Sequence, residues 1–208
     1  MPYPLAPGSA DALLFDLGRV VLDTDFQRTL ACWADHAGCA PAQLVARFSA
    51  DEAYKRHERG ELSDAEFFAS LRGSLGIEVS DAQFLEGWNA IFAGAMPEIE
   101  PLLARAAERL PLYAFSNTNR AHVAHFSEKY AGLLGHFRKM FLSSTIGLRK
   151  PDAEAYDHVI KEIGVPARRI VFFDDLKENI EGARARGLTA VHVTSTRDVA
   201  EALDALGI

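Results

Sequence analysis

The chain has 208 residues, of which 49% are hydrophobic and 25% are charged, and its formal net charge at pH 7 is -7. This composition is typical of a folded globular protein with a sizeable core, and it excludes a disordered or fibrous chain. The negative charge, without a long basic run, argues against binding to nucleic acid. The first residues, MPYPLAPGSADA, have the features of neither a signal peptide nor a membrane span. We therefore expect a cytoplasmic protein without membrane contact.

Short apolar runs rich in strand-forming residues recur between longer helical patterns. Four are clear and a fifth, 139–144, is weaker; in chain order they are residues 12–17, 111–116, 139–144, 169–174 and 189–194. Runs that are apolar on both faces are typical of a buried parallel sheet. The intervening helices are delimited by Pro151, which fits a first helical turn, and by Gly187, which follows ARAR as a stop signal. These patterns predict an α/β fold with a doubly wound, Rossmann-like parallel sheet.

Residues 23–95 interrupt this alternation, because they contain helical patterns and no convincing strand. Capping boxes are predicted at Ser63 with Glu66 and at Ser80 with Gln83. An insert of this length directly after the first strand is typical of a separate subdomain that covers the strand ends. We predict an all-helical cap at 23–95 and a core made of 1–22 and 96–208. The core of the cap is expected to contain the aromatic residues Trp33, Phe67, Phe68, Phe84, Trp88 and Phe92.

The two cysteines, Cys32 and Cys39, lie within this insert. Their spacing fits neither a zinc knuckle nor a CxxC redox pair. We predict that both are reduced, half-buried helix residues.

Polar residues follow four of the predicted strands, where the chain leaves the sheet: Asp16, then Ser116 and Asn117, then Lys150, and finally Asp174 and Asp175. Taken singly, each has a structural explanation, since aspartates cap helices and a lysine before proline is usually exposed. Ligands of open parallel sheets, however, bind outside the carboxyl ends of the strands, so these clusters are expected to meet. Three carboxylates at one point repel one another unless a cation such as Mg²⁺ lies among them. A phosphoryl group bound there would meet the metal, Lys150 and Ser116, with Asp16 free to attack it.

The segments FDLG, FSNTN, RKP and FFDDLKEN resemble, in order, the four signature motifs of the haloacid dehalogenase superfamily. Longer pieces, FDLGRVVLDTDF, HERGELSDAEF, SNTNRAH, GLRKPDAEAYDHV and VFFDDLKENIEGA, are similar to bacterial α-D-glucose-1-phosphate phosphatases and their relatives, including the phosphatase domain of soluble epoxide hydrolase. The resemblance covers nearly the whole chain, and it implies that residues 23–95 are the mobile cap of this superfamily. Because such folds host many substrates, the motifs indicate the chemistry more specifically than the substrate.

The resemblance assigns a Mg²⁺ site to the strand ends. It implies that Asp16 is both nucleophile and metal ligand and that the backbone carbonyl of Gly18 is a second ligand. It makes Asp175 a direct ligand, Asp174 a direct or water-mediated one, and Asn179 a residue that supports them.

The resemblance also assigns a phosphate site. It implies that the hydroxyl of Ser116 binds phosphate, that Asn117 assists through its backbone and side chain, and that Lys150 offsets the charge of the phosphate and the nucleophile. From the cap, His57 and Arg59 in the HERGE segment are expected to contact the substrate. We interpret the pair His122 and His125 as structural or substrate-facing rather than metal-binding.

Gly18 departs from the superfamily pattern, in which most phosphatases carry an aspartate there as general acid and base. Such a group usually contributes about 10²- to 10⁴-fold to the rate. Four nearby groups could replace it when the cap closes: Asp23, Asp25, His57 and Glu58.

We expect a Mg²⁺-dependent phosphatase, a monomer or homodimer, that hydrolyses a small phosphorylated metabolite. The resemblance implies a sugar phosphate such as glucose 1-phosphate, with an aspartyl-phosphate intermediate on Asp16. Two alternatives stay open. One is a metal-independent haloacid dehalogenase, against which Asp174 and Asp175 count. The other is a phosphate-binding regulatory protein of weak activity, which the glycine at position 18 permits.

Overall fold

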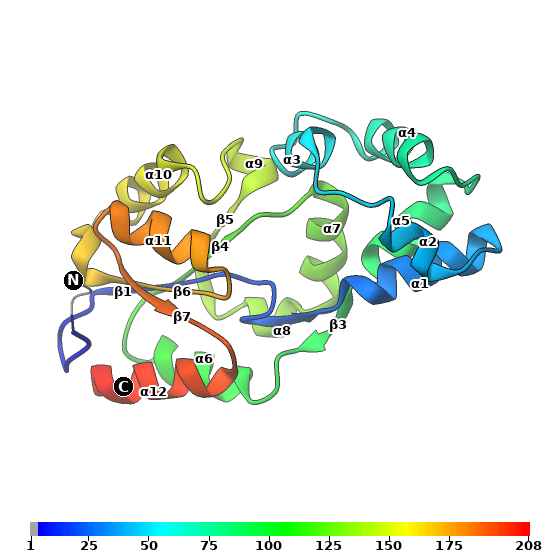
Figure 1. Ribbon diagram of the computed structural model, residues 1–208. Coiled ribbons are helices and arrows are strands. Elements are labelled where there is room, and N and C mark those ends of the chain that lie inside the picture. The colour runs from blue at the N-terminus through cyan, green and yellow to red at the C-terminus, as the bar shows by residue number, and fades with distance from the viewer. Residues whose placement is uncertain (1–3) are drawn as a thin grey trace.

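Five parallel strands form the central sheet of the computed structural model, which describes residues 4–208 (Figure 1). The strand order is β5-β4-β1-β6-β7, and every pairing is parallel. The strands are β1 (Ala12–Phe15), β4 (Leu112–Ser116), β5 (Phe137–Leu142), β6 (Ile170–Asp174) and β7 (Thr189–His192). All five predicted strands are therefore confirmed, with the weaker one starting two residues earlier than expected.

Side chains of successive strand residues alternate between two hydrophobic layers, as the period of a strand requires. In β1, Leu13 and Phe15 face one layer, and Ala12 and Leu14 face the other. The first layer is covered by α6 (Ile99–Ala107), α7 (Arg120–Lys129), α8 (Ala131–Leu134) and α12 (Thr196–Leu206). The second is covered by α10 (Ala153–Ile163) and α11 (Lys177–Ala185). Figure 1 shows α10 and α11 above the sheet and α6 and α12 below it, which confirms the doubly wound fold.

Two short helical segments complete the core: α9 (Ser143–Ile146) and the 3₁₀ turn η1 (Ala167–Arg169). The predicted helix signals hold to within two residues. Helix α10 starts at Ala153, shortly after Pro151, and α11 ends at Ala185, before Gly187 adopts a φ of 85°. No helix among residues 4–208 is both long and apolar enough to cross a membrane.

The cap contains five helices: α1 (Phe26–Ala37), α2 (Pro41–Val45), α3 (Glu52–Glu58), α4 (Asp64–Leu75) and α5 (Asp81–Asn89). Both predicted capping boxes are present, at the starts of α4 and α5. Five of the six aromatic residues pack together in the cap, whereas Phe92 packs against the core layer instead. Cys32 lies in α1, but Cys39 follows the end of that helix rather than lying in it; both are half-buried and free.

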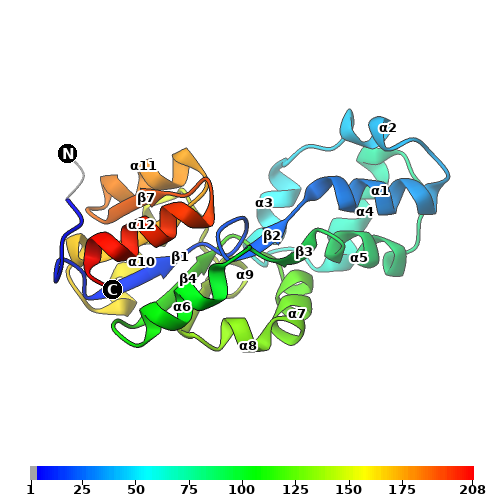
Figure 2. The ribbon, with the colours of Figure 1, turned by 90° about the horizontal axis from the view of Figure 1, so that it is seen from below.

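The cap is not purely helical, which corrects the prediction. Its two ends pair as an antiparallel ribbon of β2 (Leu22–Thr24) and β3 (Phe92–Ala95). Figure 2 shows this ribbon between the core and the cap helices. The strand β3 has the sequence FAGA, whose small residues carry little strand propensity. Its pairing partner lies far away in the chain, so no local pattern indicates this ribbon.

Candidate active site

The carboxyl ends of β1, β4 and β6 adjoin one another where the strand order reverses. The chain leaves β1 to form β4 on one side, and it returns to form β6 on the other. Asp16 directly follows β1, Ser116 ends β4 and Asp174 ends β6. This is the topological switch point at which doubly wound sheets bind ligands.

Lys150 joins two of these strand ends. Its Nζ lies 2.9 Å from Asp16 Oδ1 and 2.6 Å from Asp174 Oδ2, and its side chain is 1% exposed. The rings of Phe115 and Phe172 lie 5.2 and 5.3 Å from the same nitrogen. Burial alone would lower the pKa of Lys150, but Asp16 and Asp174 raise it above its usual value. Lys150 is therefore a buried cation, and the surface interpretation for a lysine before proline does not apply here.

Asn117 positions this lysine through its backbone. The Asn117 side-chain amide donates to the Lys150 carbonyl oxygen and its carbonyl accepts from the Lys150 N–H, both at 2.8 Å. Asn117 lines the pocket, as expected of a substrate-binding residue. Its side chain, however, is committed to Lys150, because both polar groups of the amide are already hydrogen-bonded.

The three predicted metal-ligating carboxylates lie together. Oxygen atoms of Asp16, Asp174 and Asp175 all lie within 4.8 Å of one another. Asp174 accepts hydrogen bonds from Asn179 Nδ2 to both of its oxygens, at 3.0 Å each, and from the Leu176 N–H at 2.8 Å. Asn179 therefore supports the cluster, as the resemblance implied.

The electrostatics of this cluster favour a bound cation. Burial raises the pKa of Asp16 to about 7; Lys150 opposes this rise, and Asp174 and Asp175 add to it. Burial and Asp174 likewise raise the pKa of Asp175, while Arg19, whose Nε lies 3.4 Å away, lowers it. Carboxylate oxygens are the ligands that Mg²⁺ prefers. The donor set thus fits Mg²⁺, which would be held by these three side chains.

A pocket of about 320 Å³ opens between this cluster and the cap. The core side contributes the predicted residues Asp16, Gly18, Ser116, Asn117 and Lys150. The cap and its ribbon contribute Thr24, Tyr54, Glu58 and Phe92. The site is therefore shared by core and cap, as expected of a cap that covers the strand ends.

Glu58 of the cap pairs with Arg149 of the core across this pocket. Glu58 Oε2 accepts a hydrogen bond from Arg149 Nε at 3.0 Å and lies 3.0 Å from Arg149 Nη2 in an ion pair, and both residues line the pocket wall. The Tyr54 hydroxyl also interacts with this carboxylate and favours its charged form. Burial raises the pKa of Glu58, and Arg149 and Tyr54 oppose the rise. Of the four groups considered as replacements for the missing acid, Glu58 is the one that lines the pocket.

His57 and Arg59 do not line the pocket, contrary to the expected substrate contacts. The His57 ring is buried against Phe67, with centroids 4.2 Å apart, and its Nε2 lies 2.8 Å from Asp64 Oδ1. Arg59 faces away from the pocket wall, with Nη2 donating to Glu52 Oε1 at 2.8 Å. On α3, Glu58 faces the pocket and its two neighbours do not, because adjacent helical residues point in different directions.

A buried serine, Ser143, ties the cap to the core near the pocket. Its hydroxyl accepts from the Thr118 N–H at 2.8 Å and lies 2.7 Å from the Glu58 carbonyl and 2.9 Å from that of Thr118. Gly60, with a φ of 71°, approaches the same segment so closely that a Cβ would lie 2.5 Å from the Ser144 carbonyl oxygen. The position of α3 over the pocket is therefore fixed by backbone contacts.

His122 forms part of the pocket wall and is buried. Its Nε2 lies 3.0 Å from the Trp88 carbonyl oxygen and its Nδ1 lies 3.1 Å from Asn119 Nδ2. Burial lowers the pKa of His122 to about 3, so the ring is neutral. His122 thus has a structural role in linking α7 to α5, in agreement with the interpretation above. His125 packs on Phe92 outside this pocket, with ring centroids 5.6 Å apart.

Three residues of the site escaped the sequence interpretation: Arg149, Tyr54 and Ser143. Arg149 is the first residue of the RKP motif itself, so its charge next to Lys150 was an available signal. Tyr54 lies four positions before Glu58, on the same face of α3, which helical spacing could have indicated. Ser143 follows β5, where the placement of ligands at strand ends could have identified it.

Comparison with known proteins identifies the family to which the chain belongs. A sequence profile of haloacid dehalogenase-like hydrolases matches residues 10–187. Phosphatase MT3486 from Mycobacterium tuberculosis is 32% identical over 150 residues, which cover 69% of this chain and 69% of that protein. A D-ribitol-5-phosphate phosphatase from Bacteroides thetaiotaomicron is 25% identical over 181 residues, which cover 84% of this chain and 87% of that protein.

A solved structure has the same fold. The crystal structure of a HAD family enzyme from Bacteroides thetaiotaomicron, in complex with magnesium and inorganic phosphate, superposes with a TM-score of 0.78 at 25% identity, covering 89% of this chain and 95% of that one. The chain spans only 33% of the length of drimenol cyclase drtB from Aspergillus calidoustus and 31% of sesquiterpene phosphatase astK from Aspergillus oryzae. The predicted family and fold are confirmed, and the chain belongs to the haloacid dehalogenase-like hydrolases.

Proposed function

We propose that this hydrolase is a Mg²⁺-dependent phosphatase that acts on a small phosphorylated metabolite, a sugar phosphate such as glucose 1-phosphate. The observation that carries the proposal is the convergence of the carboxylates of Asp16, Asp174 and Asp175 with the Lys150 ammonium at the switch point. The similarity to a D-ribitol-5-phosphate phosphatase supports a phosphorylated polyol or sugar as substrate.

Asp16 is the proposed nucleophile. One of its carboxylate oxygens attacks phosphorus, the bond from phosphorus to the leaving oxygen breaks, and the phosphoryl group is transferred to Asp16. Lys150, 2.9 Å from Asp16 Oδ1, offsets negative charge on the nucleophile and the phosphoryl group. Bound Mg²⁺ supplies further charge neutralisation and orients the phosphate. Water then attacks the aspartyl phosphate at phosphorus, which releases phosphate and restores the Asp16 carboxylate.

Glu58 is the proposed proton donor for the leaving oxygen. Its carboxyl group lines the pocket from the cap side, and burial raises its pKa. After donating its proton, the carboxylate is stabilised by Arg149 and by the Tyr54 hydroxyl. Protonated again by the attacking water, Glu58 is restored for the next turnover.

The size and lining of the pocket support a small polar substrate. Its volume of about 320 Å³ lies at the lower end of the range for ligand pockets. Phe92 and Tyr54 provide apolar surface for a sugar ring, and Thr24 provides a hydrogen-bonding hydroxyl group.

Phosphate release from p-nitrophenyl phosphate and from a panel of sugar phosphates, with Mg²⁺ or with EDTA, tests the proposal. We expect phosphate release that is abolished by EDTA and by the Asp16→Asn substitution. The Asp23→Asn substitution should leave this release intact, since Asp23 does not line the pocket. Release of halide from a 2-haloacid in EDTA would favour a dehalogenase instead. Tight phosphate binding without any turnover would favour the regulatory alternative.

A further inference from the structure

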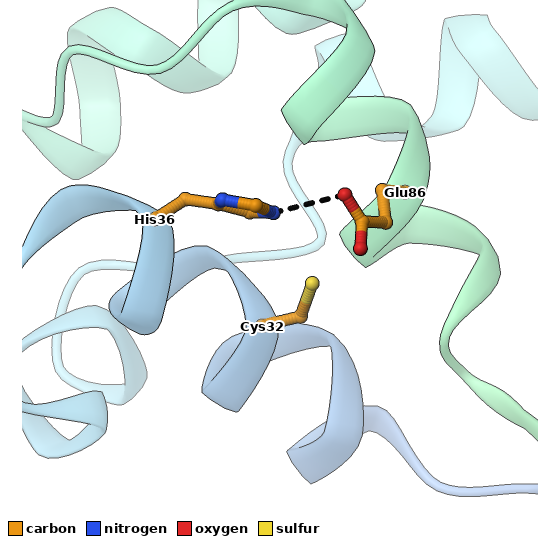
Figure 3. Close-up of side chains that lie close together, drawn as sticks. All are labelled: Cys32, His36 and Glu86. Carbon is orange, nitrogen blue, oxygen red and sulfur yellow. Dashed lines mark hydrogen bonds and ion pairs between the residues drawn. The ribbon is translucent and has the colours of Figure 1, made fainter.

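A second group of side chains with converging donor atoms lies in the cap, outside the pocket described above. Cys32 and His36 project from α1 and Glu86 from α5, and all three point into the same gap between the helices (Figure 3). The Cys32 sulfur, a His36 ring nitrogen and a Glu86 carboxylate oxygen lie within 4.8 Å of one another. His36 Nε2 lies 3.0 Å from Glu86 Oε2.

The two helices that carry these residues are held rigidly at the neighbouring positions. Trp33, next to Cys32, donates from Nε1 to the Phe84 carbonyl at 3.0 Å and stacks on Trp88 with ring centroids 5.7 Å apart. Gly87, next to Glu86, contacts the Trp33 indole so closely that a Cβ would lie 2.3 Å from it. The spacing of Cys32 and Glu86 is therefore fixed by buried packing, which preorganises the group.

We propose that Cys32, His36 and Glu86 bind a zinc ion that links α1 to α5. A sulfur, an imidazole nitrogen and a carboxylate oxygen form a donor set that suits Zn²⁺ and not Mg²⁺, which prefers oxygen alone. Zinc holds sulfur at about 2.3 Å and nitrogen or oxygen at about 2.0 to 2.2 Å, so its ligand atoms lie roughly 3 to 4 Å apart. The 3.0 Å between His36 Nε2 and Glu86 Oε2 already matches that spacing, and the Cys32 sulfur lies within 4.8 Å of both residues' donor atoms. Water would occupy the fourth position, because Glu86 is exposed.

The surrounding charges favour a cation at this point. Burial raises the pKa of the Cys32 thiol, and the carboxylates of Glu86 and Asp35 raise it further. A zinc ion bound here would offset the negative charge of these two carboxylates.

The contacts of His36 are compatible with this role. Glu86 Oε2 lies 3.0 Å from His36 Nε2, and Gln83 Nε2 lies 3.3 Å from His36 Nδ1, so Nε2 is the ring nitrogen that faces Glu86. Zinc bound at Nε2 would leave the ring proton on Nδ1. The contact that is lost, with Gln83, is already long for a hydrogen bond.

The experiment is calorimetric titration of the metal-stripped full chain with Zn²⁺ in excess Mg²⁺, paired with Co²⁺ absorption spectra. We expect one tightly bound zinc ion per chain, a thiolate-to-cobalt charge-transfer band, and a higher midpoint of thermal unfolding with zinc. Cys32→Ser abolishes the band, and His36→Gln and Glu86→Gln weaken zinc binding. Cys39→Ser is the matched control, since it removes the other half-buried cysteine and leaves the group intact. Asp16→Asn, which alters the proposed magnesium site, is expected to bind zinc like the wild type.

Either of two results would overturn the inference. One is wild-type protein that binds no zinc when Mg²⁺ is in excess. The other is zinc affinity that Cys32→Ser leaves unchanged or that Cys39→Ser also removes. Because all of these readouts are binding and stability, they do not depend on the proposed phosphatase activity.

Discussion

The carboxylate of Glu58, in the cap, accepts a hydrogen bond of 3.0 Å from Nε of Arg149, in the core, and forms an ion pair with Nη2 at the same distance, at the wall of the pocket that contains Asp16. This pair places an acidic group of the cap in the same pocket as the proposed nucleophile. The chain thus offers a carboxyl group from a different direction, although position 18 holds glycine instead of the acid usual in this superfamily.

If Glu58 donates the proton, its removal should affect poor leaving groups selectively. Glu58→Gln is expected to lower kcat on a sugar phosphate by roughly 10²-fold and to leave p-nitrophenyl phosphate nearly unaffected, because nitrophenolate leaves without a proton. Initial rates on the two substrates at saturating Mg²⁺ measure this difference. An equal loss on both substrates would instead indicate that Glu58 acts by positioning Arg149.

An aspartate at position 18 is expected to restore the activity that the Glu58→Gln variant loses. A Cβ at position 18 would lie 3.6 Å from Thr24 Oγ1, an ordinary van der Waals contact, so the position accommodates a Cβ. We expect the double variant Gly18→Asp with Glu58→Gln to recover activity on sugar phosphates. Gly18→Asp alone should change the rate little, and a large gain from this single change would show that the natural chain lacks an acid altogether.

Lys150 is expected to stabilise the fold as well as the reaction. Lys150→Met leaves the buried carboxylates of Asp16 and Asp174 without their partner, and breaking a buried ion pair in this way costs about 3 to 5 kcal/mol. Urea unfolding in EDTA measures this loss. Mg²⁺ should restore part of the stability if it binds the carboxylates, and an equal loss with and without Mg²⁺ would contradict a metal site at these residues.

The position of the cap relative to the core is expected to depend on Gly60. Gly60→Ala places a methyl group 2.5 Å from the Ser144 carbonyl, so the α3 segment must move away from the core. We predict a higher KM for the substrate. Gly38→Ala is the matched control, because Gly38 has a similar φ of 64° but no atom within 4 Å of the added Cβ. If both variants raise KM equally, backbone strain and not the close contact is responsible.

His122 makes stability depend on pH. Its pKa is about 3 in the folded protein and near 6.5 when unfolded, so between these values only the unfolded chain binds the proton. The contribution is fully present above pH 6.5 and is lost as the pH falls. From pH 7 to pH 5 this costs about 2 kcal/mol. Urea unfolding at both pH values should show this loss in the wild type and a smaller one in His122→Gln.

The sequence predicts the core well because its signals are local. Each core strand carries its own apolar run, and Asp16, Ser116 and Asp174 stand at the ends of such runs. The ribbon of β2 and β3 was missed because it depends on pairing between the two ends of the insert. That information lies in no single segment.

The sequence also does not indicate in which direction the side chains of the cap point. The HERGE segment offers His57, Glu58 and Arg59 as equivalent polar candidates, and only packing on Phe67 shows that the first is buried in the cap. The sequence does not reveal the group of Cys32, His36 and Glu86 for a related reason. The spacing of the two cysteines carries no information about Glu86, which comes from a separate helix.

Mass spectrometry of the acid-quenched enzyme during turnover of a sugar phosphate with Mg²⁺ tests whether Asp16 is the nucleophile. We expect one added phosphoryl group on the peptide that contains Asp16, absent in EDTA and absent in Asp16→Asn. Phosphate release without any covalent phosphoryl group, or with the group on another residue, would contradict the assignment of Asp16 as the nucleophile.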